Sequence, residues 1–329
     1  MFRISINGFG RIGRTFLRNA LSENLNVVAI NDLAPPSTLA HLFRYDSVHG
    51  LFNGEVSSDE QAIYINGNRI EVFNQPNTEL IPWDNIHLVI ESTGKNLDYD
   101  RASKHLQAGA KQVLISAPAA DNIPMVVLGV NDATQIIQEP IFSAASCTTN
   151  NIAPIIKVLH EKWGVKEGYI TTVHSMTGDQ NLHDAPHHDL RRARAAGSSI
   201  IPTTTGAAKA ITKIFPDLEK KLGGAGIRVP VLNGSLTDLT CILNKKATVQ
   251  EINEEIKFES ETNLKGIVEY INEPIVSVDI LNNRHSCIFD AMLTSVVGDL
   301  VKVVGWYDNE SGYSSRLVDL AKMVQKKYD

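Results

Sequence analysis

The stretch INGFGRIGR, residues 6–14, places Gly8, Gly10 and Gly13 in the spacing G-x-G-x-x-G. It follows a short apolar run, FRISIN (residues 2–7), and opens a segment whose apolar residues recur at helical spacing. Glycines in this spacing permit a tight turn, close approach of a pyrophosphate and close packing of the helix on the strand. The helix start then supplies free N–H groups for phosphates. The stretch therefore predicts a dinucleotide-binding turn between a strand and a helix.

A second strand, NVVAIND (residues 26–32), ends at Asp32, 19 residues after Gly13. A carboxylate at this point accepts hydrogen bonds from the ribose 2′-OH of NAD and repels the additional phosphate of NADP. The alternative interpretation is a tight turn with an unrelated loop aspartate. A P-loop is not expected, because STGKN (residues 92–96) lacks the earlier glycine of G-x-x-x-x-G-K-[ST].

Length and composition set the broad class. A chain of 329 residues suggests two domains, and 43% apolar with 21% charged residues is ordinary for a globular protein. The net charge of −6 argues against a general nucleic-acid surface. The three cysteines are widely spaced and form no zinc motif, so we expect a reduced, intracellular chain without a metal site. Neither a signal peptide nor a run of about 18 apolar residues is recognisable, so we expect no export and no membrane span.

The first 146 residues alternate strand and helix signals. After the second strand, AIYINGNRIEVF (residues 62–73) predicts a hairpin about Asn66-Gly67. Further buried-type strands are expected at HLVIES, QVLIS, MVVLGV and PIFSAAS (residues 87–92, 112–116, 125–130 and 140–146). Such alternation predicts an α/β domain over 1–146 with a Rossmann-type, mostly parallel sheet.

A different rhythm predicts a second, α+β domain over 147–309, with a mixed and largely antiparallel sheet. A helix is expected near 148–163 and a strand at YITTVHSM (169–176), followed by a long polar stretch, 177–199, of the kind that is usually functional. Strands with alternating polarity follow at GSLTDLTCIL, PIVSVDIL and DLVKVVGWYD (residues 234–243, 274–281 and 299–308). The last segment, 310–329, is amphipathic and is expected to pack back on the first domain as a helix.

Cys147, in SAASCTTNNIAP (residues 143–154), admits three interpretations: a buried structural thiol, a redox thiol or a nucleophile. It follows the last strand of the predicted dinucleotide sheet and opens a helix, whose positive end favours thiolate. His174, in TTVHS, is a candidate partner. A cysteine with a histidine also fits a hydrolase. The dinucleotide motif favours aldehyde oxidation, in which thiolate addition gives a thiohemiacetal that releases hydride and leaves a thioester.

Eight motifs together resemble one known family. In order they are INGFGRIGR, YDSVHG, SCTTN, TTVHS, RRARAA, IPTTTGAAKA, RVP and WYDNESGYS, and they span essentially the whole chain. They resemble phosphorylating glyceraldehyde-3-phosphate dehydrogenase (type I). The resemblance implies a cytoplasmic, glycolytic homotetramer that uses NAD and inorganic phosphate to convert D-glyceraldehyde 3-phosphate into 1,3-bisphosphoglycerate. It also implies that the polar stretch 177–199, the S-loop, lies near the cofactor of a neighbouring subunit.

The resemblance assigns roles to individual residues. Cys147 is the nucleophile and His174 the base that also polarises the carbonyl. The cofactor-binding residues are Gly8, Gly10, Arg11, Ile12, Gly13, Asp32, Thr93, Ser116, Asn309 and Tyr313. Thr177 and Arg228 bind the C3 phosphate of the substrate. The residues that bind inorganic phosphate are Ser146, Thr148, Arg192, Thr205 and Gly206. Arg191 and Arg194 remain alternatives to Arg192.

Two residues depart from the family's common pattern. Asn151 stands where many members have a second cysteine, so we expect no local disulfide at Cys147. Ala185 stands where many NAD-using members have leucine, which leaves the strictness of NAD over NADP open. The alternative functions are an erythrose-4-phosphate dehydrogenase on the same plan, a Cys/His hydrolase, and a non-catalytic NAD-binding or moonlighting protein.

Overall fold

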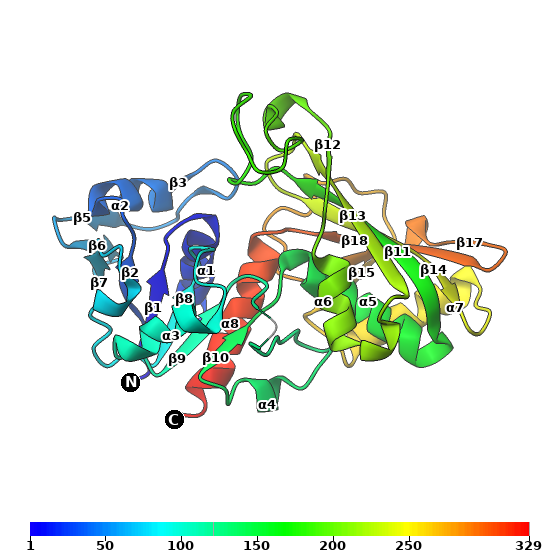
Figure 1. Cartoon of the computed structure of the whole chain (residues 1–329), viewed down its shortest axis with the longest axis horizontal. Coiled ribbons are helices and arrows are strands. Elements are labelled where there is room, and N and C mark those ends of the chain that lie inside the picture. The colour runs from blue at the N-terminus through cyan, green and yellow to red at the C-terminus, as the bar shows by residue number, and fades with distance from the viewer. Residues whose placement is uncertain (121, 329) are drawn as a thin grey trace. The chain divides into compact units, whose positions relative to one another are not determined.

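The computed structural model describes residues 1–120 and 122–328, and the chain divides into two compact units. Unit 1 comprises Met1–Val126, Asp132–Ala145 and Ser314–Asp329, and unit 2 comprises Val127–Asn131 and Ser146–Tyr313. Figure 1 labels the helices and strands of both units.

Unit 1 is built on an eight-stranded sheet in the order β10-β9-β8-β1-β2-β7-β6-β5. Its strands are β1 (Ile4–Asn7), β2 (Val27–Asn31), β5 (Val56–Ser58), β6 (Ala62–Ile65), β7 (Asn68–Phe73), β8 (Leu88–Glu91), β9 (Gln112–Ile115) and β10 (Ile141–Ser143). The strands from β10 to β7 run parallel, while β6 pairs antiparallel with both β7 and β5. This confirms the expected Rossmann-type sheet, and the β6–β7 hairpin turns at Asn66-Gly67 as expected.

The apolar runs explain why this sheet forms. Every residue of β1, β8 and β9 is buried, as befits central parallel strands covered on both faces. The helices and short elements connecting the strands are α1 (Arg11–Ser22), α2 (Pro36–Arg44), β3 (Tyr45–Asp46), β4 (Gly50–Leu51), η1 (Thr78–Leu80), α3 (Tyr99–Gln107) and α4 (Ala133–Ile136). Phe16 and Leu17 of α1 are fully buried, which confirms its predicted apolar face.

Unit 2 contains the second sheet, in the order β12-β13-β11-β14-β18-β16-β15, with β17 paired to β18. Its strands are β11 (Val165–Ser175), β12 (Ile201–Thr203), β13 (Leu222–Val229), β14 (Ser235–Leu243), β15 (Val268–Ile271), β16 (Cys287–Asp290), β17 (Ser295–Val297) and β18 (Leu300–Tyr307). Among the strands that the structure describes here, β11–β13 and β15–β16 pair parallel and the other pairs are antiparallel, so the sheet is mixed and largely antiparallel, as predicted.

The long helix α5 (Cys147–Trp163) packs on the sheet of unit 2, where it contacts β11, β14, β16 and β18 (Figure 1). It carries Pro154 in its interior, and most of its residues are buried. The remaining helical elements are η2 (Ala196–Ser198), α6 (Ala207–Ile214), η3 (Pro216–Leu218), α7 (Val249–Glu261), η4 (Ala291–Leu293) and α8 (Ser311–Gln325). Because α5 is buried against the sheet of unit 2, the position of its first residue, Cys147, is fixed relative to that sheet.

Two predicted strands are wrong. In MVVLGV only Met125 makes a β-bridge, to Ser143, and the chain then turns at 128–130 because the Asn131 side chain accepts from the N–H of Val127. PIVSVDIL forms turns, because the Asp279 carboxylate accepts from the N–H of Val276 and closes a local loop. Neither the apolar run of MVVLGV nor the alternating polarity of PIVSVDIL revealed that side chains would compete for the backbone donors.

The C-terminal helix α8 begins in unit 2 and continues, from Ser314, in unit 1. Asn19 donates to Ser315, and Lys322 pairs with Glu23 at 2.7 Å. Within residues 1–120 and 122–328, no helix is both long and apolar enough to cross a membrane.

Candidate active site

The glycine turn of unit 1 has the geometry that a bound dinucleotide requires. Gly8 has φ +91°, and a Cβ there would lie 2.7 Å from the backbone nitrogen of Thr93. A Cβ on Gly13 would lie 2.3 Å from the Gly8 carbonyl oxygen. At Gly10, by contrast, a Cβ would meet nothing within 4 Å, and no side chain caps the helix that starts at Arg11. The start of α1 therefore has no side-chain cap and lies beside open space at Gly10, which fits a pyrophosphate.

Asp32 lies beside this turn, as predicted. Its carboxylate accepts from the N–H of Phe9 at 2.8 Å and from the N–H of Ala34 at 3.0 Å. These two bonds hold the carboxylate at the end of β2, where a ribose hydroxyl would reach it. Arg11 and Ile12 open α1, but the Arg11 guanidinium pairs with Asp46 at 2.5 Å. Arg11 thus supports the loop of the YDSVHG motif as well as the helix start.

Thr93 and Ser116 follow β8 and β9. The Thr93 hydroxyl and N–H both donate to the Glu91 carboxylate, and the Ser116 hydroxyl donates to the Glu91 carbonyl oxygen at 2.9 Å. The carboxyl ends of β1, β2, β8 and β9 therefore carry the predicted cofactor residues of unit 1.

Cys147 is the first residue of α5. Ser146 caps this helix by accepting from the N–H of Thr149 at 3.0 Å, and the preceding Ala145 has φ +59°. A left-handed, non-glycine residue marks a tight turn that only a small side chain tolerates well. This turn lets the chain pass from β10 into α5 with the thiol at the helix start.

His174 faces Cys147, with Nε2 3.5 Å from Sγ. Strand register explains the neighbours of the imidazole: His174 pairs with Arg228 across β11–β13, and Ser235 pairs with Tyr307 across β14–β18. The Nδ1 atom of His174 lies 2.8 Å from the Ser175 carbonyl oxygen and 2.9 Å from Nη1 of Arg228. The sheet therefore brings the imidazole, a guanidinium and the thiol together.

Burial controls the protonation of this pair. It lowers the pKa of His174 to about 4, with a further contribution from the Arg228 charge. Burial also raises the pKa of the Cys147 thiol, which the Arg228 charge and Thr148 oppose. Burial therefore disfavours the predicted thiolate at the helix start, and the pair is a thiol beside a neutral imidazole. A neutral imidazole whose Nε2 carries no proton can accept the proton of the thiol.

A polar cluster extends from Arg228 towards the S-loop. Arg228 donates to the Thr177 hydroxyl at 3.0 Å, Thr177 bonds to Asp179, and Asp179 pairs with Arg192 at 2.7 Å. Arg192 also donates to the Thr203 hydroxyl at 3.0 Å. These contacts join Thr177, Arg192 and Arg228 in one site with two guanidinium groups, which suits phosphate.

The three candidate arginines of RRARAA differ in their surroundings. Only 17% of the Arg192 side chain is exposed. The Arg194 side chain is 67% exposed, and it pairs with Asp184. Arg191 contributes its backbone N–H to the Asp189 carboxylate. The structure thus joins Arg192, and neither neighbour, to the cluster with Arg228.

The other predicted phosphate residues lie differently. The Ser146 hydroxyl caps α5, and the buried Thr148 hydroxyl bonds to the Tyr307 hydroxyl at 2.9 Å. Thr205 accepts from the N–H of Ala207 at the start of α6, for which Gly206 is the N-cap. Within the described residues, Thr205 and Gly206 form no hydrogen bond with the Arg228 cluster. The structure therefore does not join these hydroxyls to the guanidinium groups.

Asn309 is a buried amide with a fixed orientation. Its Oδ1 accepts from the hydroxyls of Ser175 and Ser235, each at 2.9 Å. Its amide nitrogen has no hydrogen-bond partner among the described residues, so an N–H donor remains for a ligand. Tyr313 is also buried, and burial raises the pKa of its hydroxyl well above the usual value.

The remaining cysteines and Asn151 are structural. Cys241 and Cys287 are buried and free, and burial raises the pKa of Cys241 to about 12. Asn151 donates to the Trp306 carbonyl oxygen at 3.1 Å and so ties α5 to β18. Of the three thiols, Cys147 alone is partly accessible.

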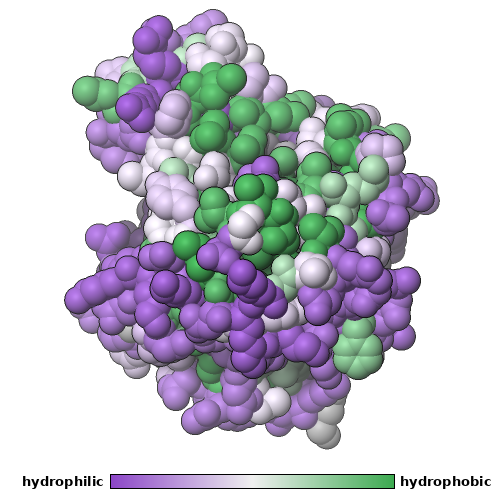
Figure 2. Space-filling model, turned by 90° about the vertical axis from the view of Figure 1, so that its right-hand side faces the viewer, coloured by the Kyte–Doolittle hydropathy of each residue, from purple (hydrophilic) through white to green (hydrophobic). Residues whose placement is uncertain are grey.

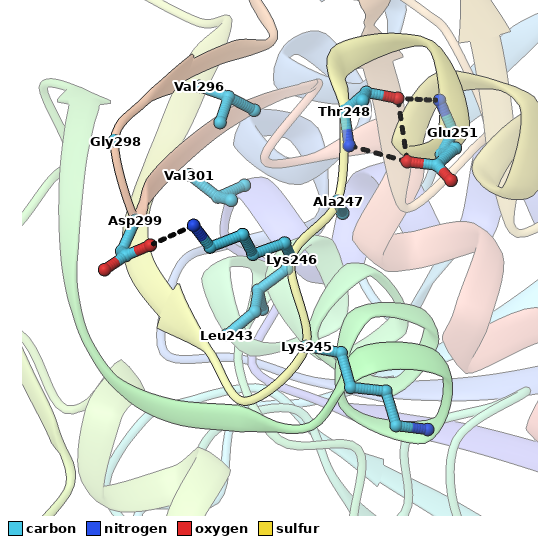
Figure 3. Close-up of a pocket in the computed structure, with 10 residues that line it drawn as sticks. All are labelled: Leu243, Lys245, Lys246, Ala247, Thr248, Glu251, Val296, Gly298, Asp299 and Val301. Atoms are coloured by element: carbon cyan, nitrogen blue, oxygen red, sulfur yellow. Dashed lines mark hydrogen bonds and ion pairs between the residues drawn. The ribbon is translucent and has the colours of Figure 1, made fainter.

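A separate surface pocket in unit 2 shares none of these residues (Figure 3). Among its charged side chains, Lys246 pairs with Asp299 at 3.9 Å, and Glu251 completes a capping box with Thr248 at the start of α7. The residues that line this pocket include neither a cysteine nor a histidine.

Sequence reasoning missed several groups that orient the site. Asp179 pairs with Arg192 and is linked to Arg228 through the Thr177 hydroxyl. Ser175 and Ser235 fix the Asn309 amide. A carboxylate in an anion site runs against the charge pattern expected for phosphate, so no sequence signal pointed to Asp179. Ser235 comes from a strand far along the chain, and only the sheet register reveals its position.

A Rossmann-type sheet with an open glycine turn, together with a cysteine–histidine pair, defines the class of dinucleotide-dependent oxidoreductases with an active-site thiol. Residues 2–99 match the family model described as the NAD-binding domain of glyceraldehyde 3-phosphate dehydrogenase. Residues 146–309 match that of its C-terminal domain.

Curated relatives agree with these matches. The chain is 49% identical to glyceraldehyde-3-phosphate dehydrogenase 1 of Bacillus cereus over 99% of both chains. It is 51% identical to glyceraldehyde-3-phosphate dehydrogenase of Thermotoga maritima, over 99% of this chain and 100% of that relative. It is 50% identical to the corresponding enzyme of Geobacillus stearothermophilus, over 99% and 98%. The chain belongs to the glyceraldehyde-3-phosphate dehydrogenase family, and its cofactor is NAD.

Proposed function

We propose that the protein catalyses the NAD-dependent oxidative phosphorylation of D-glyceraldehyde 3-phosphate to 1,3-bisphosphoglycerate in glycolysis. The observation that carries this proposal is the Cys147–His174 contact of 3.5 Å beside a site with two arginines. The names of the curated relatives support the same substrate. A cytoplasmic location is part of the proposal.

The first chemical step belongs to Cys147 and His174. The thiol proton moves to Nε2 of His174 as sulfur bonds to the aldehyde carbon, and the resulting thiohemiacetal carries the former carbonyl oxygen. The protonated imidazole donates to that oxygen and stabilises its developing charge. We propose the tautomer with its proton on Nδ1, which the Ser175 carbonyl oxygen accepts at 2.8 Å in preference to the Arg228 contact, so that the Nε2 lone pair is directed at sulfur.

The second step is oxidation, for which bound NAD supplies a hydride acceptor. The thiohemiacetal loses hydride from carbon and its hydroxyl proton to His174, which leaves a thioester on Cys147. We propose that the Asn309 amide donates to the nicotinamide carboxamide, because its carbonyl end is already held by Ser175 and Ser235. Gly8–Gly13, Asp32, Thr93 and Ser116 hold the rest of the cofactor, with Tyr313 near the nicotinamide.

The third step uses inorganic phosphate. A phosphate oxygen attacks the thioester carbon, the carbon–sulfur bond breaks, and Cys147 leaves as thiolate with the acyl phosphate as product. We propose Thr177 and Arg228 for the substrate's C3 phosphate, and Arg192 with Ser146, Thr148, Thr205 and Gly206 for inorganic phosphate. The lower exposure of Arg192 and its link to Asp179 support it over Arg191 and Arg194.

We propose that residues 1–146, with the C-terminal helix 310–329, form the NAD-binding domain and that 147–309 form the catalytic domain. The compact units support this division, although they assign Val127–Asn131 and residues up to Tyr313 to unit 2.

We further propose a homotetramer in which the S-loop lies near a neighbouring subunit's cofactor. Leu182 and Leu190 of the S-loop are 77% and 81% exposed, and the adjacent Ile200 is 71% exposed. Figure 2 shows that hydrophobic side chains gather over the upper part of one face of the molecule. Exposed apolar side chains that gather on one face of a protein are typical of an interface with another chain.

Initial-rate spectrophotometry tests the proposed reaction. NADH formation from glyceraldehyde 3-phosphate should require phosphate or arsenate, should prefer NAD to NADP, and should disappear in Cys147→Ser. A faster, phosphate-independent reaction with erythrose 4-phosphate would instead establish the alternative dehydrogenase. A full biological effect in Cys147→Ser would favour the non-catalytic alternative.

A further inference from the structure

Unit 1 contains a buried carboxylate, Glu91, that the reaction itself does not use. Only 1% of Glu91 is exposed, yet its carboxylate accepts five hydrogen bonds. Oε1 accepts from the N–H and the hydroxyl of Thr93. Oε2 accepts from Asn7 at 2.7 Å, from Asn96 at 2.9 Å and from His105 at 2.9 Å. So many donors to one buried side chain require an ionised carboxylate.

The donors to Glu91 are all neutral. The indole N–H of Trp83 lies 2.8 Å from Nδ1 of His105, and an indole N–H can only donate. Nδ1 of His105 is therefore an acceptor, so the imidazole is neutral and carries its proton on Nε2, which faces Glu91. Burial would raise the pKa of Glu91, but the interactions with His105, Thr93 and Asn7 outweigh it and lower the pKa.

This network joins the ends of three neighbouring strands. Asn7, Asn31 and Glu91 are the last residues of β1, β2 and β8, and they are register partners across the sheet. Asn31 donates to Asn7 at 2.8 Å, and Asn7 donates in turn to Glu91. The residues that follow are Gly8, Asp32 and Ser92, which begin three loops at the carboxyl edge.

The loop after Glu91 also packs directly on the glycine turn. The Ser92 hydroxyl donates to the Gly8 carbonyl oxygen at 2.6 Å. A Cβ on Gly8 would lie 2.7 Å from the backbone nitrogen of Thr93, so the backbones of the two loops are in close contact. Any shift of Thr93 therefore changes the position of Gly8.

We propose that Glu91 is a positioning residue for the NAD site, whose five hydrogen bonds fix the loops after β1, β2 and β8 relative to one another. The inference rests on the proposed role of unit 1 in NAD binding. In Glu91→Gln an amide NH2 replaces one acceptor oxygen and meets donors either from Thr93 or from Asn7, Asn96 and His105. The loops must then separate, although the side chain keeps its size.

The test compares Glu91→Gln with a matched variant, Asp290→Asn, in the full chain. Asp290 ends β16, is 3% exposed and accepts from the Trp306 indole N–H at 3.0 Å, so it is a similar buried carboxylate in unit 2. Calorimetric titration with NAD should show about tenfold weaker binding in Glu91→Gln and unchanged binding in Asp290→Asn. Iodoacetamide alkylation of Cys147, measured without NAD, should match the wild-type rate in Glu91→Gln.

Several outcomes would overturn the inference. Equal NAD affinity in Glu91→Gln and wild type would refute the inference about Glu91 and leave the proposed function standing. A wild-type chain that does not bind NAD would refute both the inference and the proposed function. Equal weakening in Asp290→Asn would show a general stability effect instead. If Glu91→Gln fails to fold, Asn96→Ala removes one donor at a half-buried position and should weaken NAD binding several-fold, and unchanged binding would again refute the inference.

The protonation state of His105 provides a readout that is independent of binding. Nitrogen-15 NMR of the imidazole should show a neutral ring with the proton on Nε2. A doubly protonated ring would contradict the neutral set of donors on which Glu91 is argued to depend.

Discussion

Arg228 lies where it contacts both the proposed catalytic pair and the proposed phosphate ligand Thr177. Its guanidinium contacts Nδ1 of His174, the Ser175 carbonyl oxygen and the Thr177 hydroxyl. Its charge lowers the pKa of His174 and of Cys147, although burial has the larger effect on each. A phosphate bound to Arg228 would therefore also alter the electrostatic environment of the reacting thiol.

Replacing Arg228 with alanine should shift the alkylation profile of Cys147 to higher pH. Loss of the positive charge raises the pKa of both members of the pair, so the pair gives up its proton only at higher pH. Iodoacetamide kinetics across pH, followed by mass spectrometry, measure this shift, and the Michaelis constant for the aldehyde should rise.

The control is Lys302→Ala, which removes a cation that pairs with Asp238 at 2.9 Å. Its alkylation profile should match the wild type. A profile in Arg228→Ala that moves to lower pH would contradict the assigned effect of the guanidinium charge.

At the scale of elements, helix α5 presents Cys147 through its first turn. Ser146 satisfies the N–H of Thr149, and Asn151 and the buried residues of α5 hold the helix on the sheet. The cap therefore lies in the same first turn as Cys147, the proposed nucleophile.

Ser146→Ala should lower the free energy of unfolding by about 1 kcal/mol through loss of the cap. It should also change the alkylation rate of Cys147, because the first turn of α5 frays. Thr248→Ala, which removes the cap of α7, should cost a similar amount while leaving the alkylation rate unchanged. Denaturant titration and iodoacetamide kinetics give both readouts, and equal alkylation rates in all three proteins would refute the link between cap and nucleophile.

The glycine turn allows a second comparison at this scale. Gly8→Ala places a Cβ against the Thr93 backbone at a φ of +91°, so it should lower the melting temperature and abolish NAD binding. Gly10→Ala places a methyl group in open space, so the fold should persist. NAD binding should nevertheless weaken, because the methyl group occupies the space that the pyrophosphate approaches. Undiminished NAD binding in Gly10→Ala would place the pyrophosphate elsewhere.

At the scale of the whole molecule, the proposed tetramer depends on apolar residues that one chain leaves exposed. Sedimentation velocity should give a particle of four times the chain mass of 36.1 kDa. Leu190→Asp should dissociate it, because a charge would be buried at the interface. Leu80→Asp, at a residue of unit 1 that is 61% exposed, is the control. A monomeric wild-type chain would refute the tetramer.

The sequence predicted most of both sheets but not every strand. Continuous apolar runs identified β1, β8 and β9, and Asn66-Gly67 identified the hairpin, because these signals depend on residues close in sequence. MVVLGV and PIVSVDIL have strand-like composition, yet Asn131 and Asp279 bind backbone donors and turn the chain. Local polarity cannot show which of these competing hydrogen bonds prevails.

By itself, the sequence determined the dinucleotide turn, the family and the pair Cys147 and His174, since each is carried by a short motif with its own chemistry. Only the tertiary structure decided the protonation of that pair and the link from Arg228 through Thr177 and Asp179 to Arg192. It also decided the set of neutral donors around the ionised carboxylate of Glu91. Burial and strand register produce these features by bringing distant residues into contact. A proton's position depends on all the groups around it, and that set exists only once the chain has folded.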